Sequence, residues 1–209
     1  MKNYIYYGIP TVVIIYVIFS VVTSLDENSQ ETRLSSQPKH AEKSADSIYL
    51  QRCPVSLSFD FPVNPPNATG YYNAQAFGRN HHVGDDWNGN GGGNSDLGDP
   101  IFSIGDGIVF FAENIGGGWG NVVRIYHNIG SPSHPQYIES LYGHLKIILV
   151  KQGDIVKKGQ QIGTMGNVDG MYYAHLHLEI RDTIDMSIGG GYSKDTPGFF
   201  NPTQFIQSH

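Results

Sequence analysis

Residues 174–180 read Ala174-His175-Leu176-His177-Leu178-Glu179-Ile180, an alternation of apolar and polar side chains. Such alternation is typical of a β-strand with one buried face, because successive side chains of a strand point to opposite faces. We therefore expect Leu176, Leu178 and Ile180 to face the core, and His175 and His177 to share the open face. In that row one imidazole can bind a metal ion while its neighbour stands beside the bound water.

Glu179 belongs to the same polar row, and the sequence leaves two roles open for it. Its carboxylate could hold a metal-binding imidazole in place from behind. It could equally form a surface ion pair with Arg181, two positions further along the chain. The alternation places Glu179 on the face of the histidines but does not decide between these roles.

Two more histidine-bearing stretches lie upstream, and they read His82-Val83-Gly84-Asp85-Asp86 and Tyr142-Gly143-His144-Leu145. On a strand, positions i and i+4 face the same way, so His82 and Asp86 can approach one ion. His81 and Asp85 have the same spacing, and spacing alone leaves both registers open. A lone histidine in an apolar strand, such as His144, is more often a hydrogen-bonded core residue, so its functional role depends on the whole set.

Taken together, the three stretches supply enough imidazole and carboxylate to hold one zinc ion in an open site. Two histidines remain over for chemistry. Three such stretches in one small β domain are much harder to obtain by chance than any one of them. The sequence therefore indicates a metal-dependent active site rather than three unrelated surface features.

The rest of the chain predicts a single mainly β, antiparallel domain over residues 51–209. Short apolar runs separated by glycine, proline and asparagine turns predict strands at Ile101–Ile104, Gly107–Ala112, Asn121–His127, Ser140–Leu145 and Ala174–Ile180. A Gly-Asp turn, a short strand and a second glycine turn occur twice, starting at Gly98 and at Gly153. This repetition predicts the hairpins of a barrel-sandwich hybrid, as in lipoyl carrier domains. No lysine is displayed at a hairpin tip, which argues against a carrier function.

The N-terminus adds an apolar helix and a polar linker. No charged residue occurs between Tyr4 and Leu25, and about 20 apolar residues are enough to cross a bilayer as a helix. Residues 1–25 are therefore either an uncleaved membrane anchor, which we favour, or a signal peptide. Residues 26–50 are polar and aperiodic, which predicts a flexible linker. Either interpretation exports the rest of the chain.

Composition excludes two further classes of protein. Aspartate and glutamate outnumber lysine and arginine, 19 against 13, so we expect no nucleic acid as a partner. Cys53 is the one cysteine of the 209 residues, so neither an intrachain disulfide nor a cysteine zinc cluster can form.

The order of these motifs resembles the lysostaphin-type (LytM-like) zinc endopeptidases of bacterial cell walls. Their pattern is His-x-Gly-x-Asp, a later Tyr-x-His-Leu and then His-x-His with a following glutamate, and residues 82–179 contain every element in that order. The resemblance covers roughly residues 75–206 and implies the duplicated hybrid motif fold with one Zn²⁺ per domain. Gly84 then selects the register, because the glycine stands two positions after the first ligand. The resemblance assigns the zinc ligands to His82, Asp86 and His177, and the catalytic roles to His144 and His175.

The function implied by this resemblance is zinc-dependent hydrolysis of peptide cross-links in peptidoglycan, in the bacterial cell envelope, with the N-terminal segment in the membrane. A non-catalytic domain of the same fold, which binds peptidoglycan or activates other wall hydrolases, is the main alternative. A zinc peptidase for protein substrates, or a secreted bacteriocin, is a further one. The stretches 87–96 and 131–135 extend beyond the simplest family members, and we expect both to flank the substrate groove.

Overall fold

The computed structural model describes residues 45–209, so the helix predicted within residues 1–25 and most of the predicted linker lie outside the described part. The described chain is mainly β, which confirms the predicted fold class. Its helices and strands are α1 (Ala45–Arg52), β1 (Tyr71–Gln75), β2 (Asp85–Gly89), β3 (Pro100–Phe102), β4 (Gly107–Asn114), β5 (Asn121–Asn128), β6 (Tyr137–Ile148), β7 (Ile155–Val156), β8 (Gln161–Met165), β9 (Leu176–Arg181), β10 (Phe199–Phe200) and α2 (Pro202–Ser208), with short helical turns at Asn64–Ala68 and Arg79–His81. None of the helices in residues 45–209 is long and apolar enough to cross a membrane.

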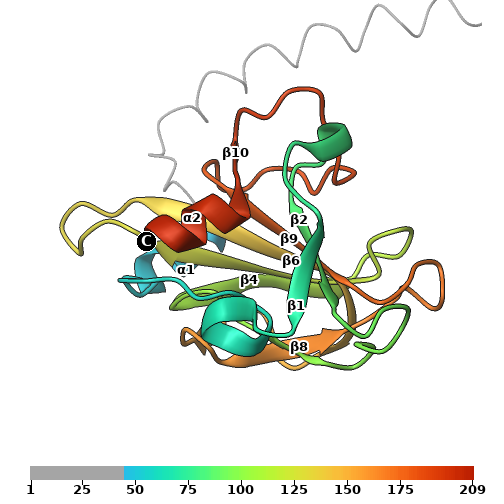
Figure 1. The fold of residues 1–209 in the computed structure, drawn as a ribbon. Coiled ribbons are helices and arrows are strands. Elements are labelled where there is room, and N and C mark those ends of the chain that lie inside the picture. The colour runs from blue at the N-terminus through green and yellow to red at the C-terminus, as the bar shows by residue number, and fades with distance from the viewer. Residues whose placement is uncertain (1–44) are drawn as a thin grey trace, which may run out of the picture. The chain divides into compact units, whose positions relative to one another are not determined.

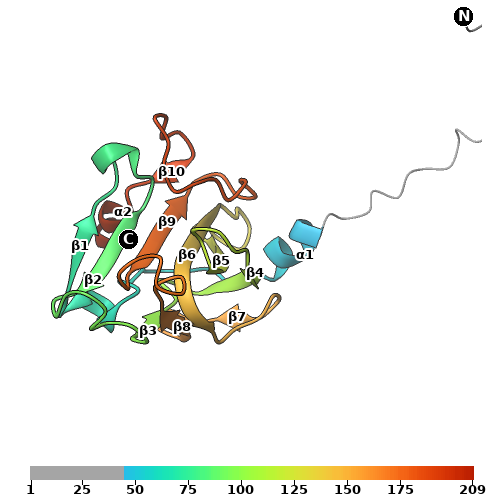
Figure 2. The same cartoon turned by 90° about the vertical axis from the view of Figure 1, so that its right-hand side faces the viewer.

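The strands form one curved antiparallel sheet in the order β1-β2-β9-β6-β5-β4-β7 (Figures 1 and 2). Strand β10 pairs with β9, and β8 pairs with both β3 and β6. The two Gly-Asp repeats pair across one another, because β3 of the first repeat joins β8 of the second and β4 of the first joins β7 of the second. The sequence repetition therefore corresponds to an exchange of strand pairing between two similar hairpins.

Strand β9 shows the alternation that its sequence predicts. Leu176, Leu178 and Ile180 are fully buried in the main apolar core, together with side chains of β2, β5, β6 and β8. Their neighbours His177, Glu179 and Arg181 point to the other face and are also buried, under the segment that follows the strand. Both faces of β9 are thus covered, one by hydrocarbon and one by charged groups.

Strand β6 changes its pairing partner in the middle. Residues 139–143 pair with β9, whereas residues 145–148 pair with β8. His144 lies between the two sets, and its φ of 61° is in the left-handed region that L-residues rarely adopt. The backbone turns at this residue because one strand must follow two neighbours that diverge.

The structure contains two short helices that the sequence pattern does not predict. Helix α1 overlaps the predicted linker at residues 45–50 and places Tyr49 and Leu50 against Ile108, Phe110 and Tyr126. Helix α2 begins at Pro202, and the side chain of Asn201 accepts a hydrogen bond from the Gln204 amide at 3.0 Å. With 7 and 8 residues, both helices are too short to show an apolar period of 3.6. The Asn-Pro pair, an N-cap followed by proline, was the available signal for α2.

Asp85, which the family pattern leaves without a role, anchors α2 to the sheet. It is fully buried, and its two oxygens accept hydrogen bonds from the Phe77 amide at 2.9 Å and from the Thr203 amide and hydroxyl at 3.0 and 2.6 Å. Its neighbour Asp86 points to the opposite face of β2. The two aspartates therefore point to opposite faces of one strand. Asp85 holds the fold together on one face, and Asp86 belongs to the candidate site on the other.

His127 is a second buried histidine with a structural role. Its Nδ1 lies 2.8 Å from the Asp106 carbonyl oxygen, and its Nε2 lies 2.7 Å from the Ser140 hydroxyl. Since a carbonyl only accepts, Nδ1 carries the proton and Nε2 accepts from the hydroxyl. Burial of the ring lowers the pKa of His127 to about 4.

This shift predicts acid destabilisation of the metal-free protein. Below the ordinary pKa of 6.5 the unfolded chain takes up a proton that folded His127 refuses, so stability is full above that pH and falls as the pH drops toward about 4. As the pH falls through this window, we expect the free energy of unfolding of the parent to drop relative to that of His127→Gln by up to about 1.4 kcal/mol per pH unit. Urea unfolding at several pH values measures it, and exposed His134→Gln is the control. Parallel pH profiles for the parent and His127→Gln would contradict the assignment.

Candidate metal centre

Three predicted ligand residues meet at the junction of β2 and β9. Asp86 on β2 stands directly opposite His177 on β9 in the antiparallel register. His82 follows the helical turn Arg79–His81 and forms an isolated backbone bridge with Tyr192. The ring of His82 reaches the same point from the side, so residues far apart in sequence present three donor atoms to one position.

The spacing of these donor atoms fits a single zinc ion. The Nε2 atom of His82 lies 3.0 Å from Nδ1 of His177 and 3.3 Å from Oδ1 of Asp86, and the last two atoms are 2.9 Å apart. Ligands held at about 2.0–2.1 Å in a tetrahedron stand about 3.3 Å from one another. The three atoms thus form one triangular face of a tetrahedron and leave its fourth corner open toward the cleft.

The hydrogen bonds on the outer edges of the two rings fix their protonation. The Nδ1 of His82 lies 3.1 Å from the Gln75 carbonyl oxygen, and the Nε2 of His177 lies 3.0 Å from a carboxylate oxygen of Glu179. Both partners accept, so the proton of each neutral ring points outward. In the neutral rings the inward nitrogens therefore present lone pairs to each other and to the Asp86 carboxylate, an arrangement that a cation between them stabilises.

Electrostatics at the centre are consistent with a cation-binding position. Burial disfavours a charged His177, but the hydrogen bonds that the protonated ring donates to Asp86 and Glu179 outweigh it and raise the pKa of His177 to about 9. Burial acts against the charge of Asp86 as well, and the hydrogen bonds from His177 and His82 nevertheless hold the pKa of its carboxyl well below the usual range. Both shifts reflect a cluster that stabilises positive charge, whether a proton or a metal ion carries it.

Two glycines make room for the His177 ring. A Cβ on Gly84 would lie 2.5 Å from the Leu178 carbonyl oxygen and 2.9 Å from Cε1 of His177. A Cβ on Gly143 would lie 3.0 Å from the Trp119 ring and 3.5 Å from Cβ of His177. The glycine of the His-x-Gly-x-Asp pattern thus has a steric cause, since any larger residue would push β2 away from β9 at the donor atoms.

The two remaining histidines lie together beside the donor triad. His144 and His175 have ring centroids 4.6 Å apart, and the His144 ring is 5.8 Å from that of His177. His175 bridges to Gly166 just before β9 begins, so the bend of β6 and the start of β9 bring the two rings together. Burial, followed by the nearby His175 and His177, lowers the pKa of His144 to about 3, so this ring is neutral near pH 7.

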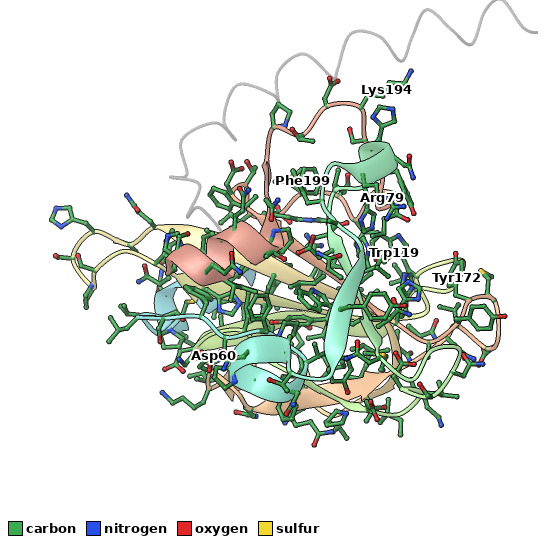
Figure 3. All side chains as sticks on the ribbon, in the orientation of Figure 1. Asp60, Arg79, Trp119, Tyr172, Lys194 and Phe199 are labelled. Carbon is green, nitrogen blue, oxygen red and sulfur yellow. The ribbon has the colours of Figure 1, made fainter. Side chains whose placement is uncertain are left out.

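A cleft of about 560 Å³ exposes all five of these residues. Its walls come from the end of strand β1 and from three loops, and their residues are Gln75, Gly118, Trp119, Tyr172, Gly189, Gly190, Gly191 and Tyr192. Figure 3 shows Trp119 and Tyr172 at the same edge of the sheet. The Trp119 ring stacks on His144 with centroids 5.8 Å apart, and Tyr192 lies 5.2 Å from the His82 ring. Aromatic rings therefore flank the donor triad on both sides.

The segment 186–192 was missed by the sequence analysis. It has no strand or helix pattern, and the glycine run Gly189-Gly190-Gly191 beside Tyr192 was the available signal. The Gly189 carbonyl accepts a hydrogen bond from Trp119 Nε1 at 2.9 Å, and the Gly191 carbonyl accepts one from the Val83 amide at 3.1 Å. We call residues 186–192 the groove wall.

The two sequence extensions differ in their position. The stretch 87–96 lies beside the cleft as expected, because Asn88 and Asn94 line a second hollow that also includes His175. The prediction that residues 131–135 flank the groove is wrong. These residues join β5 to β6 at the Asn128–Tyr137 end of the hairpin, whereas the site lies at the Asn121–Leu145 end. Chain order alone could not tell which end of the hairpin faces the site.

Glu179 contacts both the His177 ring and Arg181, so it takes both of the roles that the sequence left open. Both contacts are buried. One carboxylate oxygen lies 3.0 Å from Nε2 of His177, and the other accepts a hydrogen bond from Nε of Arg181 at 2.8 Å. Glu179 and Arg181 are both fully buried. The glutamate therefore holds the His177 ring and pairs with Arg181 at the same time.

A mainly β domain with a three-donor metal position and two unligated histidines in an open cleft has the arrangement of a mononuclear zinc hydrolase. The family model described as Peptidase family M23 matches residues 87–188, which include His144, His175 and His177. The chain is 42% identical over 84 residues to Lipoprotein NlpD of Yersinia enterocolitica, covering 40% of this chain and 78% of that protein. The chain therefore belongs to peptidase family M23, which confirms the resemblance drawn from its motifs.

Two further relatives share a smaller part of their own length. Peptidoglycan DD-endopeptidase ShyA of Vibrio cholerae is 38% identical over 84 residues, which cover 40% of this chain and 18% of that protein. Murein hydrolase activator NlpD of Escherichia coli is 39% identical over 84 residues, which cover 40% of this chain and 20% of that protein. The matched region is thus about a fifth of each of these two proteins.

The fit of Gly84 predicts a specific defect in metal binding. We expect Gly84→Ala to lower the zinc affinity by about 10- to 100-fold, because the added methyl group displaces His177 from the other two donors. Competition with a chromogenic chelator measures the affinity. Gly190→Ala is the control, since its added Cβ meets no heavy atom within 4 Å. A folded Gly84→Ala protein with parental zinc affinity would contradict this account of the pattern.

Proposed function

We propose that this chain is a zinc-dependent endopeptidase that hydrolyses the peptide cross-links of bacterial peptidoglycan. The observation that carries the proposal is the triangle of lone-pair atoms from His82, Asp86 and His177, with His144 and His175 beside it in one cleft. When bound there, zinc supplies a Lewis acid that lowers the pKa of a coordinated water toward about 7 and polarises the scissile carbonyl.

His175 is suited to the role of general base. Its Nδ1 lies 2.8 Å from the Tyr173 carbonyl oxygen, which can only accept, so Nδ1 carries the proton of the neutral ring. The lone pair of Nε2 then remains to take a proton from the attacking water. The partly exposed ring can pass that proton to the leaving amine.

His144 is suited to stabilise the oxyanion. Its Nδ1 is buried and has no hydrogen-bond partner among the described residues. Buried N–H groups without a partner are rarer in proteins than under-satisfied acceptors, so we assign the proton to Nε2. Because its pKa is lowered to about 3, the ring stays neutral and donates this proton as a hydrogen bond. The two histidines thus divide the work, with His175 accepting a proton and His144 donating a hydrogen bond.

The choice of peptidoglycan rests on the cleft and on the relatives. No lysine or arginine is among the residues that line the cleft, which suits a peptide backbone better than a highly anionic ligand. One relative is named a peptidoglycan DD-endopeptidase and another a murein hydrolase activator. This substrate lies outside the cytoplasm, so we place the domain in the cell envelope, with residues 1–25 as the membrane attachment.

The second candidate is a non-catalytic activator of other wall hydrolases. The name of the Escherichia coli relative favours this alternative, because the relative is 39% identical to this chain over 84 residues. The presence of all three donor residues and both free histidines in one cleft favours catalysis. The two functions differ in one measurable respect, since an activator alone releases nothing from a purified wall.

Digestion of purified sacculi tests the proposal. We expect the zinc-loaded full chain to release soluble muropeptides from sacculi of at least one cross-link type, identified by mass spectrometry. A chelator should abolish release and added zinc should restore it. If zinc-loaded protein releases nothing from directly cross-linked or glycine-bridged sacculi but accelerates a separate wall hydrolase, the activator function replaces the proposed one.

The division of roles predicts two different kinds of inactive variant. We expect His177→Ala to lose zinc, because it removes one of three protein donors. His144→Ala should keep zinc and lose activity by at least about 100-fold, because it removes only a hydrogen-bond donor to the transition state. Metal analysis by mass spectrometry, run beside the digestion assay, separates the two effects. A full complement of zinc in His177→Ala would contradict the ligand assignment.

A further inference from the structure

A row of buried charged side chains crosses the sheet on the face opposite the apolar core and ends at the metal centre. Arg124 on β5 forms a bidentate pair with Glu139 on β6, with distances of 2.7 and 2.8 Å. Glu139 stands opposite Arg181 on β9, and Arg181 pairs with Glu179. We call these four residues the buried charge row. Burial of four charged groups beneath one loop costs solvation free energy, because each ion loses its hydration there. Net stability is therefore a weak explanation for this row.

Arg181 is the hub of this row. Its Nε donates to Oε2 of Glu179 at 2.8 Å and its Nη2 lies 2.6 Å from the same oxygen. The other oxygen of Glu179 lies 3.0 Å from Nε2 of His177. The guanidinium therefore fixes the carboxylate that in turn fixes the orientation of a metal-ligand ring.

The same guanidinium also holds the groove wall. It donates to the carbonyl oxygens of Ser187 at 3.2 Å and Ile188 at 2.8 Å. The next residues, Gly189–Tyr192, line the cleft. No strand or helix continues through residues 182–198, so carbonyl contacts of this kind take the place of a sheet ladder.

We propose that Arg181 is a positioning residue that sets the His177 ring and the groove wall together. The proposal rests on the proposed function for its effect on substrate, and not for its effect on zinc. Lysine cannot replace arginine here, because a single ammonium lacks the planar set of N–H groups that reaches the carboxylate and the carbonyls at once. The alternative is that Arg181 only contributes to stability as one of several buried ions.

Arg124 provides a matched control for that alternative. It belongs to the same buried charge row, pairs with Glu139, and donates to the Met186 carbonyl at 2.7 Å. Among the described residues, its hydrogen bonds and ion pairs involve neither Glu179 nor His177. Arg124→Lys therefore damages the row and the start of the groove wall but leaves the partner of the metal ligand intact.

Zinc affinity and substrate kinetics of the full chain test the proposal. We expect Arg181→Lys to lower the zinc affinity by about 10- to 100-fold in chelator competition, and Arg124→Lys to change it by less than about threefold. At saturating zinc, Arg181→Lys should also raise KM for a soluble muropeptide. Glu179→Gln should reproduce the loss of zinc affinity with little change in KM, because Arg181 can still hold the wall carbonyls.

Each outcome decides between the two accounts. Unchanged zinc affinity in folded Arg181→Lys overturns the proposal, as does an equal loss in Arg124→Lys, which would show general loosening. If thermal melting shows that Arg181→Lys does not fold, Glu179→Gln decides, and parental zinc affinity in that variant overturns the proposal. The zinc measurements need no catalysis, so a chain that cleaves no muropeptide would refute the proposed function and leave this test standing.

Discussion

Three potential metal-donor atoms lie within about 3 Å of one another at the bottom of the cleft, and the fold holds them there. The atoms belong to His82, Asp86 and His177, which come from a turn and from two neighbouring strands. The outward hydrogen bonds to the Gln75 carbonyl and to Glu179 favour the tautomer of each neutral ring whose lone pair points inward. A metal ion can accept a lone pair from all three atoms at once, so their arrangement suits a metal position.

Holding such an arrangement requires rigidity on both faces of β9. On one face Leu176, Leu178 and Ile180 pack in the apolar core, and this packing fixes the register that puts Asp86 opposite His177. On the other face buried charges replace hydrocarbon, since a metal-ligand ring needs a polar partner behind it. A buried ion pair costs solvation, and its value here lies in the direction that it gives to the imidazole rather than in net stability.

Sequence patterns revealed the parts of the site that depend on strand periodicity. The alternation of β9 predicted both its core face and its row of histidines. The glycine of the first motif, Gly84, marked the position where the His177 ring lies close to the backbone of the neighbouring segment. Periodicity failed for α1 and α2, which have 8 and 7 residues, and for the groove wall, which is held by Arg124 and Arg181. Contacts from side chain to carbonyl across 5 to 62 positions leave no local pattern to recognise.

The different environments of His144 and His175 follow from where strand β6 changes partner. A strand that pairs with β9 and then with β8 must turn between them, and the left-handed φ at His144 costs about 1–3 kcal/mol for a non-glycine residue. The turn buries one ring beneath Trp119 and leaves the other partly exposed, bonded only to a carbonyl. Two identical side chains thereby acquire different burial and different hydrogen-bond partners, and the proposed division of roles between them depends on this asymmetry.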